Sequence, residues 1–366
     1  MNQRLFSCLS VALSGCVLWG CGNTGAPARD YGPLLEKLSE QVILPEHEAC
    51  AAQADALVSS VQALVDRPDA DALANAQSAW RAARKAYRVL DALHFGPGYT
   101  LHITERIDVA PADPAEIEAL AKGEGSVTDA TVSQAGGQAK GFLGLEYLLF
   151  ADSTPSSAGS SAPALADDDL AERRRALALA MAHEIAKSTH QLDDAWRPGA
   201  GGYIEQIQLA GAGSSQYSSQ RAAVDDMVGG VAYALEWIVG VRLAQPLGRK
   251  SGGVPDPSLD PTSRSDSAVA DMQASLAGIV AMYDGEGFSA VIRSKSAKLD
   301  QAVLANLSDV EAALAAIPAP FGEAVVNDTP IVKAAFDTSS GLKKTWNTDV
   351  SSALGATLKP SDNDGD

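Results

Sequence analysis

Residues 139–150 read AKGFLGLEYLLF, an apolar run that carries one carboxylate, Glu146, in its middle. Four residues of this run share one helical face by their i, i+3, i+4 and i+7 spacing: Leu143, Glu146, Tyr147 and Phe150. When that face packs, Glu146 loses water, and a buried charge needs a partner. The stretch therefore predicts a core helix whose single acid must be paired or hydrogen-bonded.

The composition of the whole chain favours an all-α fold. Of its 366 residues, 46% are hydrophobic and only 5% are aromatic, and alanine and leucine are frequent. A sequence of this composition, with few runs of β-branched residues, is typical of helices. Near-helical apolar spacing predicts long helices over residues 34–65, 69–93, 167–196, 216–243, 265–283, 294–317 and 331–354, with a shorter one over 111–122. Pro45 predicts a kink or break in the first of them.

The formal net charge of −18 restricts the partners of the protein. The chain has no basic stripe that could offset phosphates, so we expect no nucleic-acid binding. An acidic surface is compatible with cation capture, but it is also the ordinary surface of a well-solvated protein.

The N-terminus resembles a bacterial lipoprotein signal over residues 1–21. A short basic region at Arg4 precedes an apolar segment over residues 5–19, which is too short for a comfortable membrane span. Two lipobox-like sequences follow, LSGC ending at Cys16 and LWGC ending at Cys21. The preceding residues favour Cys16, and the polar residues after Cys21 favour Cys21. Lipidation at either would give an envelope protein, periplasm-facing or at the outer membrane, held by acyl chains.

The remaining chain divides into segments by composition. Residues 22–33 are expected to be a tether, and residues 153–165, which include STPSSAGSSAP, a linker. The linker separates an N-terminal helical half, 34–152, from a C-terminal helical half, 166–357, and an acidic tail covers 358–366. Residues 234–237 (ALEW) resemble residues 144–147 (GLEY), so the bundle-like halves could reflect an internal duplication or chance.

A second helix carries a mixed aromatic and charged stripe. Trp80, Arg84, Tyr87 and Asp91 lie at i, i+4, i+7 and i+11, and the turn HFGPG at 94–98 ends the helix. One interpretation is an amphipathic seam with a surface salt bridge between Arg84 and Asp91 or its neighbours. The other places Arg84 and Asp91 near a polar site.

These motifs together resemble the imelysin family. Its signature is Gly-x-His-x-x-Glu on a helix, and Gly141 and Glu146 occupy the matching positions, whereas Leu143 replaces the histidine. Further similarity comes from the Trp-Arg-Tyr helix that begins at Trp80, the turn containing Gly96 and Pro97, and the Arg106-Ile107-Asp108 segment. The resemblance implies an all-helical, two-part body with the signature helix near the interface. It also implies either peptidase activity or a role in periplasmic iron uptake.

The substitution of the histidine weighs against a peptidase. A metal-dependent peptidase needs about three protein ligands and a base. Carboxylates alone can hold a hard cation such as ferric iron, and Glu146, Asp91, Asp108 and Glu236 could supply them. We therefore expect a non-enzymatic binding lipoprotein linked to iron or metal uptake, with envelope iron-uptake proteins as partners. A metal-dependent peptidase and a structural member without metal stay open as alternatives; in the latter, Glu146 pairs with Arg84 or Arg106. His102, in the loop beside Arg106, is a weaker candidate.

Overall fold

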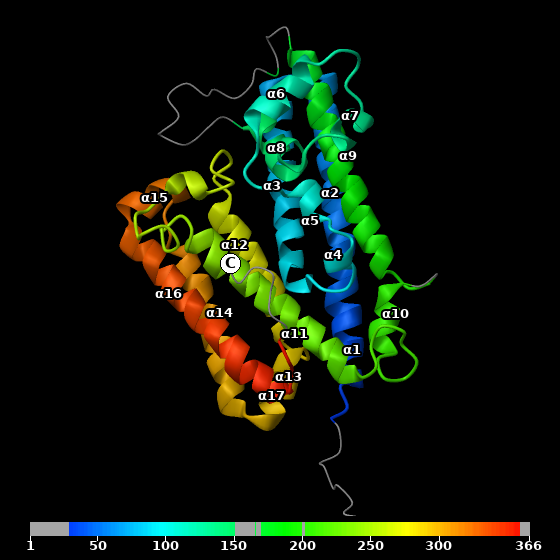
Figure 1. Ribbon diagram of the computed structural model, residues 1–366, viewed down its shortest axis with the longest axis vertical. Helices are drawn as coiled ribbons and strands as arrows, with labels where there is room; N and C mark the ends of the chain where they lie inside the picture. The colour runs from blue at the N-terminus through cyan, green and yellow to red at the C-terminus, as the bar shows by residue number, and fades with distance from the viewer. Residues whose placement is uncertain (1–28, 151–164, 166–169, 200–201, 359–366) are drawn as a thin grey trace, which may run out of the picture. The chain divides into compact units, whose positions relative to one another are not determined.

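The computed structural model describes residues 29–150, 165, 170–199 and 202–358, and every regular element in these ranges is helical (Figure 1). The prediction of an all-α fold is confirmed. The α-helices are α1 (Gly32–Leu38), α2 (Leu44–Asp66), α3 (Ala70–Val89), α4 (Pro97–Thr100), α5 (Thr104–Ile107), α6 (Pro114–Lys122), α7 (Asp129–Ser133), α8 (Gly141–Leu149), α9 (Ala171–Trp196), α10 (Tyr203–Gln208), α11 (Gln220–Glu236), α12 (Ala268–Tyr283), α13 (Phe288–Lys295), α14 (Ala297–Ala315), α15 (Phe321–Asn327), α16 (Thr329–Thr345) and α17 (Ser351–Leu354). Short π- or 3₁₀-helical segments are η1 (Ser39–Ile43), η2 (Leu90–Leu93), η3 (Gly137–Ala139), η4 (Trp237–Leu243), η5 (Pro257–Leu259) and η6 (Trp346–Val350).

The predicted signal peptide, with Cys16 and Cys21, lies outside the described residues, as do most of the linker and the tail. In the part of the chain that is described, no helix combines the length and the apolarity needed to cross a bilayer. The described residues from Tyr31 onward form one compact unit.

Two groups of helices surround the core. In the first, α2 packs along α3 and α9, and α8 packs on both α3 and α9. In the second, α16 packs on α14 and η4, and α12 packs on α14 and α11 (Figure 1). The groups meet where α12 contacts α3. Helix α9 follows the predicted linker but packs on helices that precede it, and the division of the chain into two halves stays a prediction.

Local sequence explains where the helices of the first group begin and end. Asp69 caps α3 by accepting a hydrogen bond from the backbone N–H of Ala72 at 2.8 Å. Pro45 lies in the first turn of α2, directly after the π-helical segment η1, so the expected break is a change of helix type. Gly96 has a φ of +50°, and a Cβ there would lie 2.5 Å from the Tyr203 ring, so the turn after η2 requires glycine.

Candidate functional site

The signature helix α8 is fixed in place by backbone contacts that its sequence makes possible. Gly141 has a φ of +66°, and a Cβ on it would lie 2.3 Å from the carbonyl oxygen of Ile107, so only glycine permits this approach. The indole Nε1 of Trp80 on α3 donates to the carbonyl oxygen of Phe142 at 3.0 Å. Leu143, at the position of the family histidine, is 1% exposed in the core.

Glu146 is buried on α8 and is held by one residue of the C-terminal half. It is 2% exposed, and its Oε1 accepts hydrogen bonds from the backbone N–H of Ser265 at 2.8 Å and from Ser265 Oγ at 2.6 Å. The ion pair with Arg84 or Arg106, which belonged to the alternative of a structural member without metal, is not formed, because Ser265 is the partner of Glu146. Burial raises the pKa of Glu146 to about 7, an effect that the two Ser265 donors only partly offset.

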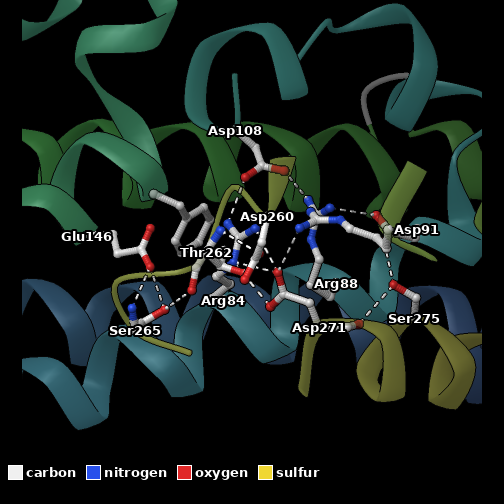
Figure 2. A network of polar contacts seen from close by, with 12 residues as sticks. Arg84, Arg88, Asp91, Asp108, Glu146, Asp260, Thr262, Ser265, Asp271 and Ser275 are labelled. Atoms are coloured by element: carbon white, nitrogen blue, oxygen red, sulfur yellow. Dashed lines mark hydrogen bonds and ion pairs between the residues drawn. The ribbon is translucent and has the colours of Figure 1, made fainter. Parts of the chain in front are cut away.

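Arg84 and Arg88 on α3 share one carboxylate, that of Asp108 (Figure 2). Arg84 Nη1 and Arg88 Nη2 each lie 2.7 Å from a different oxygen of Asp108, and all three side chains are at most 3% exposed. Burial alone would raise the pKa of Asp108, but the two guanidinium groups lower it below its ordinary value. Asp108 is thus a fully paired, ionised group.

The same guanidinium of Arg84 also reaches Asp271 on α12. Arg84 Nε donates to the two oxygens of Asp271 at 3.1 and 2.9 Å, which joins α3 to α12 through a buried ion pair. Arg242 on η4 also forms an ion pair with Asp271, with 3.5 Å between Nη1 and Oδ2. Burial lowers the pKa of Arg242, which is 6% exposed.

Asp91 forms one end of the network. Its Oδ1 lies 3.5 Å from Arg88 Nη1, and its Oδ2 accepts a hydrogen bond from Ser275 Oγ at 2.6 Å. The interpretation with a surface salt bridge between Arg84 and Asp91 does not hold, because Asp91 is buried and forms its ion pair with Arg88. Arg84 and Asp91 do lie in one polar region.

Asp260, in the loop between η5 and α12, adds a fifth buried carboxyl group. Its Oδ1 accepts hydrogen bonds from the backbone N–H of Thr262 at 2.9 Å and from Thr262 Oγ1 at 3.1 Å, while its Oδ2 is buried without a hydrogen-bond partner. Burial raises the pKa of Asp260 to about 6. Asp260 also raises the pKa of Glu146 electrostatically, so the two acids repel each other.

Three sequence candidates lie apart from this network. Arg106 is half-buried and donates to Gln191 Oε1 at 2.9 Å. Glu236, from the second Leu-Glu-aromatic sequence, forms an ion pair with Lys343. His102 is exposed, and its Nδ1 lies 3.2 Å from Glu105 Oε1. The expected set of four carboxylates, Asp91, Asp108, Glu146 and Glu236, therefore does not converge on one point.

The carboxyl groups of the network are of two kinds, those paired with arginine and those without an arginine partner. Its centre consists of arginine–aspartate pairs that neutralise each other. Glu146 and Asp260, by contrast, accept hydrogen bonds from hydroxyl and backbone N–H groups and have raised pKa values, so each holds a proton more readily than an ordinary carboxyl group. Among the described side chains, no three His, Cys, Asp or Glu residues are grouped so that they could hold a metal ion.

The sequence did not predict the other residues of the network, which are Arg88, Arg242, Asp260, Thr262, Ser265, Asp271 and Ser275. Arg88 could have been found, because it follows Arg84 by four residues on the same helical face. The others carry no local signal. They meet Arg84 and Glu146 only through long-range packing.

Comparisons with known proteins bear on the fold and the family of the chain. Iron-regulated protein A of Synechococcus elongatus is 25% identical over 229 residues, which are 62% of this chain and 58% of that protein, so the match spans less than two thirds of the relative's length. A crystal structure of a candidate iron-regulated protein A precursor from Parabacteroides distasonis superposes with a TM-score of 0.76, at 19% identity, over 90% of this chain and 97% of that chain. A crystal structure of an imelysin-like protein from Psychrobacter arcticum gives 0.72 at 16% identity, over 90% and 96%. The model of the imelysin family (Peptidase M75) matches residues 43–339, and the chain belongs to that family.

Proposed function

We propose that this protein is a non-enzymatic binding protein of the cell envelope that takes up a cation, with iron as the cargo. The envelope location rests on the lipoprotein-like sequence of residues 1–21. Iron rests on the name of the Synechococcus elongatus relative, iron-regulated protein A. We infer that the cargo enters at Glu146 and Asp260.

The charge balance of the buried network is the observation that carries this proposal. Five carboxyl groups are buried with three guanidinium groups, those of Arg84, Arg88 and Arg242. The arginines contact the aspartates at the centre of the network, which leaves Glu146 and Asp260 held only by hydroxyl and backbone N–H donors. Buried carboxylates without a counter-ion are unstable as anions. A bound cation would replace their protons and supply the missing positive charge.

Hard cations match these donors. Carboxylate oxygens are the ligands that ferric iron and similar ions prefer, and hydroxyl groups of Thr262 and Ser265 lie beside them. Because three suitable side chains do not converge as they stand, binding requires the loop that carries Asp260 and Ser265 to adjust, with water completing the coordination shell.

A peptidase is less well supported by this site. Leu143 is buried and apolar at the histidine position, so α8 presents no His–Glu pair to a metal. Without the histidine, the helix lacks one of the ligands that such an enzyme needs. We expect no chelator-sensitive cleavage of an unfolded protein substrate.

Equilibrium dialysis of the purified protein with Fe²⁺ under anaerobic conditions, and with Zn²⁺ for comparison, tests the proposal. Glu146→Gln should lower the iron affinity at least tenfold, because it removes a negatively charged ligand. Asp300→Asn is the matched control. Asp300 is also buried and accepts hydrogen bonds from the hydroxyl groups of Tyr283 and Ser289 at 3.1 and 2.7 Å, but it has a counter-ion, Arg293 at 3.7 Å, and lies outside the network.

The variant Leu143→His tests whether iron binding needs the family histidine. Binding by the unmodified protein would mean a carboxylate site that works without the family histidine. Binding by Leu143→His alone would mean that the scaffold is intact but this chain does not take iron, and the proposal would fail. Absence of binding in both proteins would direct attention to an organic or protein ligand.

A further inference from the structure

Arg242 is a buried cation with one guanidinium nitrogen, Nη1, that has no hydrogen-bond partner. It is 6% exposed, and its Nη1 lies 3.5 Å from the nearest oxygen of Asp271 without forming a hydrogen bond. The Arg242 guanidinium carbon lies 5.6 Å from the centre of the Trp237 ring. A buried donor of this kind is costly unless it is paired, so a ligand oxygen could accept a hydrogen bond from it.

The unused acceptor of Asp260 belongs to the same region. Its Oδ2 makes no hydrogen bond, and Arg242 lowers the pKa of this carboxyl group electrostatically, although the two side chains do not form an ion pair. The region thus offers a carboxylate oxygen and a guanidinium nitrogen that are both buried without a hydrogen-bond partner, on two groups that interact electrostatically. A bare cation would satisfy only the acid, and a simple anion would satisfy only the arginine.

We propose that the cargo binds as a cation already chelated by a small hydroxycarboxylate, with Glu146 and Asp260 facing the cation and Arg242 donating to a carboxylate of the chelator. This inference rests on the proposed function, because it names the chemical form in which the cation arrives. Arginine suits the role, since its planar fork matches a carboxylate.

Entry of such a ligand requires the loop between η5 and α12 to move. This loop carries Asp260 and Ser265, and Ser265 holds it to Glu146 through two hydrogen bonds. The next residue, Asp266, has a φ of +51°, a conformation that a non-glycine residue adopts at some cost. Movement of this one segment would free Glu146 and Asp260 together while α3, α8 and α12 keep their ion pairs.

The test compares three probes on the purified protein by isothermal titration calorimetry: ferric citrate, citrate alone, and anaerobic Fe²⁺ without a chelator. We expect ferric citrate to bind at least tenfold more tightly than Fe²⁺ and citrate alone to bind negligibly. Arg242→Gln should remove that tenfold advantage, so that ferric citrate binds this variant no more tightly than Fe²⁺ does, whereas Arg242→Lys should retain part of it. Arg174→Gln is the matched control, because Arg174 is a buried arginine paired with Glu118 outside the network.

The outcomes separate the two proposals. If Fe²⁺ binds through Glu146 but ferric citrate binds no better, or equally well in Arg242→Gln, the chelate inference fails and the cation function stands. Equal binding of citrate alone would also overturn the inference, because the cation would then be unnecessary. If no iron probe binds, both proposals fail. Circular dichroism of Arg242→Gln and Arg242→Lys shows whether either variant is folded.

Discussion

Asp108 and Glu146 are both buried carboxyl groups in one polar network, but their neighbours give them opposite acid strengths. Asp108 lies between two guanidinium groups, each 2.7 Å away, and its pKa is lowered. Glu146 receives only neutral donors from Ser265, and burial raises its pKa to about 7. A saturated ion pair fixes how α3 is joined to the rest of the fold. A carboxyl group without a counter-ion is still able to pair with a cation, whereas a carboxylate that is already paired with two arginines is not.

The largest effect should follow from removing the charge of Asp108. Asp108→Asn leaves the buried guanidinium groups of Arg84 and Arg88 without a shared counter-ion, and breaking one partner of a buried ion pair costs about 3–5 kcal/mol. Urea denaturation at pH 7 measures the loss in free energy of unfolding. A loss below about 1 kcal/mol would show that the centre of the network is not what joins these helices, and the contrast with Glu146 would disappear.

The second effect is a pH dependence that belongs to Glu146. Because its pKa is raised to about 7 from an ordinary 4.5, the folded protein binds more protons than the unfolded chain between those values, so this group makes the protein less stable as the pH rises. Between pH 5 and pH 8 the contribution is about 2–3 kcal/mol, from the cost of 1.36 kcal/mol per pKa unit. Glu146→Gln should therefore gain stability relative to the unmodified protein over that range.

Denaturation curves at pH 5 and pH 8 for both proteins give this difference directly. Asp260, whose pKa is raised to about 6, acts in the same direction and remains in both proteins, so the difference between them reports Glu146 together with its repulsion of Asp260. If the difference in free energy of unfolding between the two proteins stayed constant across this pH range, Glu146 would have an ordinary acidity, and its raised pKa could not support a binding role.

The sequence predicted the helices and the buried acid, but it did not predict the partner of that acid. Helical periodicity and the cap at Asp69 are local properties, and Glu146 on an apolar face is visible from its neighbours alone. The identity of the residue that meets Glu146 depends on which loop packs on α8, and Ser265 lies 119 residues away. Charge matching suggested an arginine, whereas Arg84 was already engaged by Asp108 and Asp271. The helical pattern of a sequence does not show which of several buried acids an arginine pairs with.

The smallest effect should follow from Ser265→Ala, which weakens the hold on Glu146 without removing it. The hydroxyl group at 2.6 Å is lost, but the backbone N–H at 2.8 Å remains, so the expected cost is about 1 kcal/mol at pH 8, the usual value of one hydrogen bond. The pKa of Glu146 should rise further, because a donor to its charged form has gone. Carbon-13 NMR titration of the glutamate carboxyl groups measures that change. Ser275→Ala is the matched control, since it removes an equally short hydroxyl contact from Asp91 at the other end of the network. If Ser275→Ala moved the Glu146 titration as much as Ser265→Ala does, the two ends would act as one unit, and the binding capacity assigned to Glu146 would belong to the whole network.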